Sequence, residues 1–129
     1  MRHRMTIAGA LLVAIFSRPY VASAFRWTVA QTPGPAMTRV PQFENDCAAS
    51  WTSVIPPHTE STLHRHDRYR TVIGIVGGAL TTVSADGRKT VTRYETGKAY
   101  WQTPMPPGEM HKDVNDTDKT IELVVVELK

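Results

Sequence analysis

The stretch LHRHDRYRTVIGIVGG, residues 63–78, joins a pair of histidines to a β-branched run that ends in two glycines. Valine, isoleucine and threonine favour strands, and a Gly-Gly pair marks the end of one. Successive side chains of a strand point to opposite faces, so we expect His64 and His66 on the same face. One strand can then offer two imidazoles to a single metal ion.

Segments of strand-like composition recur along the chain. They are SWTSVI (50–55), ALTTVS (79–84), RKTVTRYE (88–95), GKAYWQTP (97–104) and TIELVVVEL (120–128). Asp86-Gly87, between two of these runs, is a strong hairpin signal. No amphipathic helix is evident after the first 24 residues. Short strands at regular spacing predict an antiparallel sandwich or barrel.

The N-terminal residues are typical of a secretory signal peptide. A basic start, MRHR, precedes the apolar run MTIAGALLVAIF (5–16) and the small residues ASA (22–24). We predict a signal peptide over 1–24 and a secreted or periplasmic chain. A membrane anchor is the alternative, but the apolar run is shorter than the ~18 residues that indicate a span. The segment 25–42, with three prolines, predicts an extended N-terminal arm before a single domain over 43–129.

Charge and cysteine content exclude some classes of protein. The chain has 15 basic and 12 acidic residues, and removal of the three arginines of the predicted signal makes the two counts equal. No basic stripe remains of the kind that nucleic acid requires, and no membrane contact is expected after cleavage. Cys47 is the only cysteine, so no internal disulfide framework exists. We expect a buried, inert thiol, with a bridge between subunits or a metal ligand as alternatives.

A third histidine can complete the candidate metal site. His58, His64, His66 and His111 all follow the predicted signal. His111 is the best third ligand because it comes after PMPPGEM (104–110), a predicted tight turn that would direct its side chain. Asn115 follows at a spacing that would brace the next turn.

These stretches, taken in order, resemble the two motifs of the cupin superfamily. The first motif is a glycine, His-x-His, a glutamate and a glycine, and its spacing matches this chain throughout. Here His58 stands in place of the first glycine and Arg70 in place of the glutamate. The second motif is matched by Gly97, Pro106, Gly108, His111 and Asn115. Its first gap is three residues longer than usual, with Thr103 where a proline is commonest.

The resemblance covers residues 43–129 and implies an all-β, antiparallel jelly-roll barrel. It also implies one divalent metal ion per chain, held by His64, His66 and His111. It does not indicate the reaction, because cupins catalyse many chemistries.

Arg70 alters the expected site. It shares the strand parity of the two histidines, yet a cation beside a divalent ion is unfavourable. It can turn outward at a bulge, pair with Glu95 or Glu109, or hold an anionic group of a substrate or an oxygen species. Three neutral imidazoles without the glutamate leave coordination positions open, as in catalytic sites. Copper(II) has the highest affinity for such ligands, so we favour copper, with iron or zinc as alternatives.

Two further residues are candidates for the site. Gln102 is a candidate weak fourth ligand, and Tyr100 has the same strand parity. Together with Arg70, these residues are the predicted catalytic groups. Aromatic residues can stack on a sugar or pack the barrel; they are Trp51, Tyr69, Tyr94 and Trp101.

The expected function is that of a secreted, copper-favouring oxidoreductase that uses dioxygen or peroxide and an external electron donor. In size, export and histidine-only site the chain is similar to small secreted copper cupins that cleave cellulose oxidatively. This similarity makes extracellular carbohydrate, such as cellulose or its oligosaccharides, the expected substrate. A non-redox isomerase or lyase acting on a sugar or small acid, and a non-catalytic ligand-binding protein, are the alternatives. The final strand is apolar on both faces near Val124–Val126, which predicts a homodimer.

Overall fold

The computed structural model describes residues 34–129, so the predicted signal peptide and the first half of the predicted arm lie outside the described residues. Nine strands form two sheets, and no helix occurs within this range. Residues 34–129 therefore contain no helix that could cross a membrane. The strands are β1 (Thr38–Glu44), β2 (Ala48–Ile55), β3 (Thr59–Glu60), β4 (Arg70–Val76), β5 (Gly78–Ser84), β6 (Lys89–Tyr94), β7 (Ala99–Gln102), β8 (His111–Asn115) and β9 (Ile121–Leu128).

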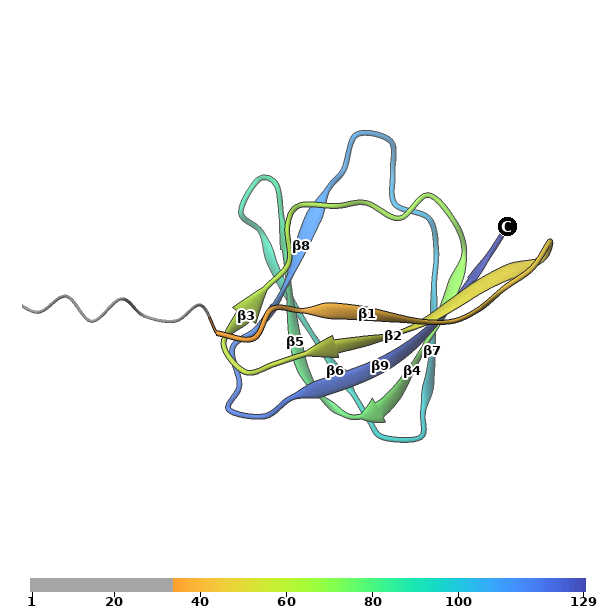
Figure 1. Cartoon of the computed structure of the whole chain (residues 1–129). Coiled ribbons are helices and arrows are strands. Elements are labelled where there is room, and N and C mark those ends of the chain that lie inside the picture. Colours follow the sequence, from red (N-terminus) through yellow and green to blue (C-terminus); the bar gives the residue numbers. More distant parts are fainter. Residues whose placement is uncertain (1–33) are drawn as a thin grey trace, which may run out of the picture. The chain divides into compact units, whose positions relative to one another are not determined.

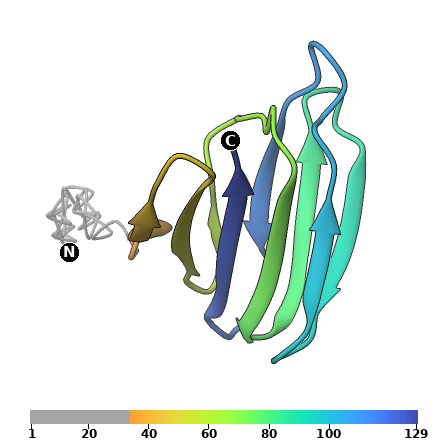
Figure 2. The ribbon, with the colours of Figure 1, turned by 90° about the vertical axis from the view of Figure 1, so that its right-hand side faces the viewer.

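The two sheets enclose a common interior (Figures 1 and 2). The five-stranded sheet has the order β1-β2-β9-β4-β7, and the four-stranded sheet has the order β3-β8-β5-β6. Every pairing between named strands is antiparallel. Neighbours within a sheet are mostly distant in sequence, as in a jelly roll. The predicted all-β, antiparallel jelly-roll class is confirmed.

The hairpin predicted at Asp86-Gly87 joins β5 to β6. Gly87 has a φ of +88°, a conformation that glycine adopts without steric cost. Its backbone N–H donates to the carbonyl of Ser84 at 2.8 Å, and the Asp86 carboxylate accepts from the backbone N–H of Arg88 at 3.1 Å. The turn chemistry of the sequence thus sets this connection.

The first strand begins earlier than we expected. We placed Phe43 at the start of the domain, but β1 starts at Thr38 and pairs with β2 from Thr38–Val54 to Glu44–Ala49. Pro41 suggested a loop, yet β1 is an edge strand, and such strands tolerate proline because one side of the backbone needs no partner. The register shifts between Pro41 and Phe43.

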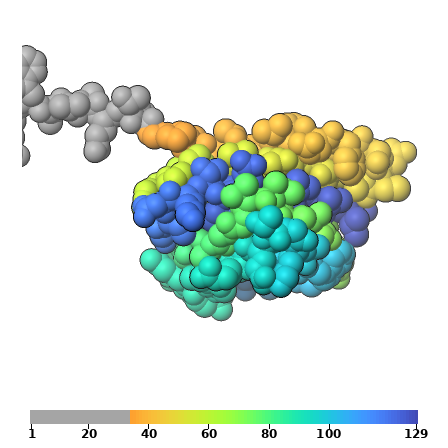
Figure 3. Space-filling view, turned by 90° about the horizontal axis from the view of Figure 1, so that it is seen from below, coloured from red at the N-terminus to blue at the C-terminus, as the bar shows by residue number. Residues whose placement is uncertain are grey.

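The core lies on the inner face of the five-stranded sheet and against β5. Its fully buried members are Ile55, Val72, Leu80, Ile121, Leu123 and Val125. Strand β9, which is central between β2 and β4, contributes three of them in strict alternation because successive side chains of a strand point to opposite faces. The intervening Val124 and Val126 are only half-buried on the outer face, where β9, β4 and β7 lie side by side (Figure 3).

Cys47 is exposed, so the expected buried thiol is wrong. It lies in the turn between β1 and β2, where the side chain of Asn45 accepts hydrogen bonds from the backbone N–H groups of Cys47 and Ala48 at 2.9 and 3.0 Å. The turn places the thiol outside both sheets, and the side chain is therefore exposed to solvent.

Asn115 braces the turn between β8 and β9, as its spacing predicted. Its side chain is fully buried, and its amide nitrogen donates to the carbonyls of Ile55, Pro56 and Lys119 at 2.8–3.0 Å. Its amide oxygen accepts from the backbone N–H and the hydroxyl of Thr117 at 3.0 and 2.7 Å. One side chain thus joins β2, β8 and the turn after β8.

Candidate metal centre

The histidine pair lies in the segment between β3 and β4, not within a strand as we expected. Strand β4 begins only at Arg70. His64 is instead held by an isolated antiparallel bridge to His111, with N–H to carbonyl distances of 2.8 and 2.9 Å in the two directions. The backbone between His64 and Arg70 is irregular, and Arg65 and Asp67 form an ion pair within it.

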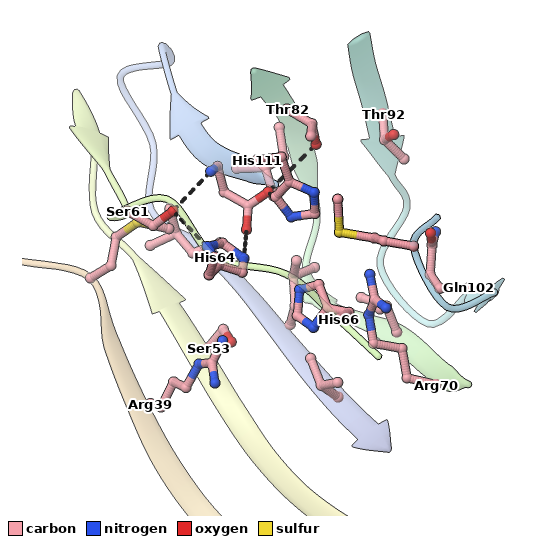
Figure 4. Close-up of a pocket in the computed structure, with 18 of the residues that line it drawn as sticks. Arg39, Ser53, Ser61, His64, His66, Arg70, Thr82, Thr92, Gln102 and His111 are labelled. Carbon is pink, nitrogen blue, oxygen red and sulfur yellow. Dashed lines mark hydrogen bonds and ion pairs between the residues drawn. The ribbon is translucent and has the colours of Figure 1, made fainter. Parts of the chain in front are cut away.

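The structure brings the three predicted ligands together. The ring centroids of His64 and His66 are 5.0 Å apart, those of His64 and His111 are 4.6 Å apart, and those of His66 and His111 are 5.4 Å apart. One ring nitrogen of each lies within 4.8 Å of the others. Figure 4 shows the rings converging on one side of the interior. Three imidazoles in this arrangement could bind a metal ion.

His64 has an unsatisfied nitrogen that faces this cluster. Its Nδ1 lies 2.9 Å from the carbonyl oxygen of Thr62, and since a carbonyl only accepts, Nδ1 carries the proton. The lone pair is therefore on Nε2, which is buried and has no hydrogen-bond partner. An unpaired buried acceptor is costly, and a metal ion would satisfy it. The residues thus fit a metal.

A carboxylate that we did not predict lies beside two of the three histidines. Asp113 Oδ2 lies 3.5 Å from Nε2 of His64, and Oδ1 lies 3.8 Å from Nε2 of His111. With the His64 proton on Nδ1, its Nε2 and the carboxylate oxygens of Asp113 are all acceptors, and a cation bound between them would make the contact favourable. Strand parity was the available signal, since His111-x-Asp113 on β8 repeats the spacing of His64-x-His66.

Hydrogen bonds hold Asp113 in this position. Its backbone N–H donates to the hydroxyl of Ser61 at 2.9 Å, and the hydroxyl of Thr82 donates to Oδ1 at 3.5 Å. The carboxylate is 24 % exposed. It is therefore oriented from both the four-stranded sheet and the segment that carries His64.

Burial keeps the imidazoles of His66 and His111 neutral. It lowers the pKa of His66 to about 3, and the nearby Arg70 is the next cause. Burial also lowers the pKa of His111, although the Asp113 carboxylate opposes the shift. Neutral imidazole is the form that binds metals, so both rings are in the ligating form at neutral pH.

Arg70 lies inside the barrel. Its side chain is only 7 % exposed, so it does not turn outward, and the register shift of β4 occurs later, between Gly74 and Val76. Glu95 pairs instead with Lys98 at 2.8 Å, and no ion pair joins Arg70 to any residue within 34–129. Arg70 therefore neither turns outward nor pairs with Glu95 or Glu109.

Gln102 lies beside Arg70, whereas Tyr100 lies away from the site. Gln102 is opposite Arg70 in the pairing of β4 with β7 and lines the cavity. The hydroxyl of Tyr100 accepts from the backbone N–H of Glu95 at 2.8 Å and donates to the carbonyl of Arg93 at 3.2 Å. Tyr100 thus braces the connection between β6 and β7 and is not brought to the histidines.

His58 is also outside the cluster. It has a φ of +53°, in the left-handed region that favours the glycine of the cupin motif. Its exposed ring bonds Asp118 at 2.7 Å. The backbone conformation explains why glycine is usual at this position.

A cavity of about 870 Å³ adjoins the three histidines. Its lining includes the cationic residues Arg39 and Arg70, the acids Glu60 and Asp113, and the apolar residues Val72, Leu80, Leu123 and Val125. Of the four aromatic residues considered above, Trp51 and Tyr94 line it. Tyr69 and Trp101 instead stack on each other, with centroids 5.6 Å apart, and both are about half exposed.

No protein-family model matches the sequence. No curated protein matches it either. Solved structures do match: a cupin domain from Bordetella pertussis is 23 % identical, with a TM-score of 0.65 over 74 % of this chain and 95 % of that one. An uncharacterised double-stranded β-helix protein from Klebsiella pneumoniae is 18 % identical, with a TM-score of 0.57 over 76 % and 81 %. The polyketide cyclase RemF from Streptomyces resistomycificus is 21 % identical, with a TM-score of 0.54 over 71 % and 64 %.

The chain therefore has the cupin fold, as the two sequence motifs implied. Within that fold it is a single barrel whose three histidines could bind a metal ion beside an interior cavity.

Proposed function

We propose that the chain is a metal-dependent enzyme of the oxidoreductase type, with the ion held by His64, His66 and His111. The observation that carries this proposal is the buried, unpartnered Nε2 of His64, which faces both the other imidazoles and a carboxylate. A redox-active ion bound there would supply one-electron transfer and the activation of dioxygen or peroxide.

Copper is the ion that we favour. Imidazole ligands suit copper, iron and zinc, and copper(II) binds most tightly of the divalent series. Asp113 lies beside this three-histidine donor set, and its carboxylate would offset part of the ion's charge, as the glutamate of the cupin motif does. Iron and zinc therefore stay as alternatives that the metal analysis below distinguishes.

The protein's own residues prepare the site for a substrate. Thr62 and Ser61 fix the orientations of His64 and Asp113, so little reorganisation is needed on binding. The apolar residues of the cavity exclude water from one side of the site, and Gln102 offers an amide on the other. Trp51 and Tyr94 offer aromatic surface to a substrate in the cavity.

Extracellular carbohydrate, such as cellulose or its oligosaccharides, is the proposed substrate class, with an external electron donor. The support is the aromatic surface in the cavity together with the export that the N-terminal residues predict. A non-redox reaction is the second candidate. The similarity to a protein described as a polyketide cyclase favours it, as does a donor set that also suits zinc.

Metal analysis tests the function directly. The full chain, as processed by the expressing cell, is loaded in turn with Cu(II), Zn(II) and Fe(II), and metal content is measured after dialysis. We expect one copper per chain, nitrogen hyperfine structure in the electron paramagnetic resonance spectrum, and reduction by ascorbate. His64→Ala should lose the metal, while His58→Ala, which removes an exposed histidine, should retain it. Preference for zinc, or activity that survives metal removal, would reject the redox proposal.

We also propose a homodimer formed through the outer face of the five-stranded sheet. Thr52, Val124, Ile73 and Ala99 lie in one cross-strand row on this face, and Trp101 beside them is 58 % exposed. A second copy would cover this apolar surface. Light scattering across a range of concentrations tests it, and a monomer mass at every concentration would reject the dimer.

A further inference from the structure

Arg70 is a buried cation without a partner among the described residues. Its Nη1 atom is fully enclosed and makes no hydrogen bond. Glu127 lies opposite it in the pairing of β4 with β9, but no ion pair joins the two side chains. Glu127 and Asp113 favour the charged form of Arg70, but burial outweighs them and lowers its pKa, so a buried cation with no ion pair or hydrogen bond at Nη1 is costly. A bound anion would remove that cost.

The guanidinium points into the cavity. Figure 4 shows it between His66 and Gln102, on the side of the cavity away from Ser61. Gln102 is its cross-strand partner, and the amide nitrogen of this residue can add a second donor for the same ligand. The position is close enough to the histidines for Arg70 to be the second cause of the lowered pKa of His66.

The chemistry of these groups favours a carboxylate over a phosphate. A guanidinium binds a planar carboxylate through two parallel hydrogen bonds, and one guanidinium with one amide matches a single negative charge. The adjoining wall is apolar, with Val72, Leu80 and Leu123, and would contact the carbon skeleton of an organic acid. Arg39, which lies 4.9 Å from the ring of Trp51, adds positive potential elsewhere in the lining.

We infer that Arg70 and Gln102 form a carboxylate-binding subsite beside the three histidines, and that the substrate is a small organic acid anchored there. The subsite itself requires no metal, whereas the statement about the substrate rests on the proposed function. This inference narrows the proposed carbohydrate class from neutral chains such as cellulose to sugars that carry a carboxylate, such as uronic or aldonic acids.

Benzoate and its neutral analogue benzamide test the subsite. Both are titrated into the full chain after chelator treatment, with binding followed by calorimetry and by ligand-observed NMR. We expect benzoate to bind at least tenfold more tightly than benzamide, and Arg70→Gln to remove that preference. Arg93→Gln, which removes an exposed arginine of β6, should change benzoate affinity by less than twofold. Equal binding of the two ligands, or an unchanged preference in Arg70→Gln, would overturn the subsite.

Thermal stability gives a second readout that a purely structural arginine would not produce. Because the buried charge is unpaired, Arg70→Met should raise the melting temperature of the ligand-free protein, and benzoate should stabilise only the parent chain. An Arg70→Met protein that melts lower or fails to fold would overturn the inference. Metal retention is measured on the same samples. Metal binding without benzoate preference rejects the subsite alone, and benzoate preference without metal binding rejects the proposed function alone.

Discussion

Replacing Asn115 with alanine should cause the largest loss of stability of any single substitution in the turn between β8 and β9. The substitution removes five hydrogen bonds, and because the amide has two hydrogens for three carbonyls, about four act independently. At about 1 kcal/mol net for each bond, the free energy of unfolding should fall by about 3 to 5 kcal/mol. For a domain of this size that is a fall in melting temperature of about 15 °C or more.

Urea and thermal unfolding followed by circular dichroism measure this loss. Asn115→Asp should be at least as damaging, because a carboxylate would face three carbonyl oxygens inside the protein. Asp116→Ala, an exposed neighbour, should change stability by less than about 0.5 kcal/mol and is the matched control. If Asn115→Ala lost less than about 1.5 kcal/mol with an unchanged denaturant slope, the reasoning from counted hydrogen bonds would be refuted.

Other substitutions test the metal centre and the barrel. Asp113→Asn should weaken copper retention about tenfold or more in competition with a chelator, while the exposed Asp67→Asn should not; equal affinities would remove Asp113 from the centre. Chelator treatment should lower the melting temperature of the copper-loaded chain and leave that of His64→Ala unchanged; an equal fall in both would point to a metal bound elsewhere. Gly74→Ala should cost about 2 kcal/mol or more in urea unfolding, because its Cβ would meet the backbone carbonyl of Glu95. Gly34→Ala, where nothing lies nearby, should be neutral, and equal stability of the two variants would show that the backbone can shift.

The fold and the three histidines could be predicted from the sequence because the spacings of two motifs match those of the cupin superfamily. The motif around His64 and the motif ending at Asn115 bring distant segments together only in an antiparallel barrel. The hairpin at Gly87 followed from turn chemistry alone. The start of β1 was missed because a proline that disrupts a central strand is harmless at an edge.

The alternation of side chains along a strand explains why Gln102 and Tyr100 were both candidates for the site, although only Gln102 lines the cavity. Parity indicates which face a side chain occupies but not its depth along the barrel. Tyr100 and Gln102 share a face, yet two residues of strand separate them by about 7 Å, and only Gln102 reaches the cavity. Asp113 had the right parity and was overlooked because the cupin motif places its carboxylate elsewhere. The alternation of β4 places Arg70 on the inner face, but whether a carboxylate pairs with it there depends on packing between the sheets, which no local pattern encodes.

The candidate metal centre draws its groups from different parts of the barrel. His111 and Asp113 belong to the four-stranded sheet, whereas His64 and His66 lie on the segment that crosses to β4 of the other sheet. An ion bound by the three histidines would join β8 to the segment that leads into β4, so metal binding would be coupled to the folding of this part of the barrel. At an ion concentration one hundred times the dissociation constant, this linkage adds about 2.7 kcal/mol to the free energy of unfolding. The lifetime of the chain in the presence of proteases then depends on the supply of the ion as well as on the sequence.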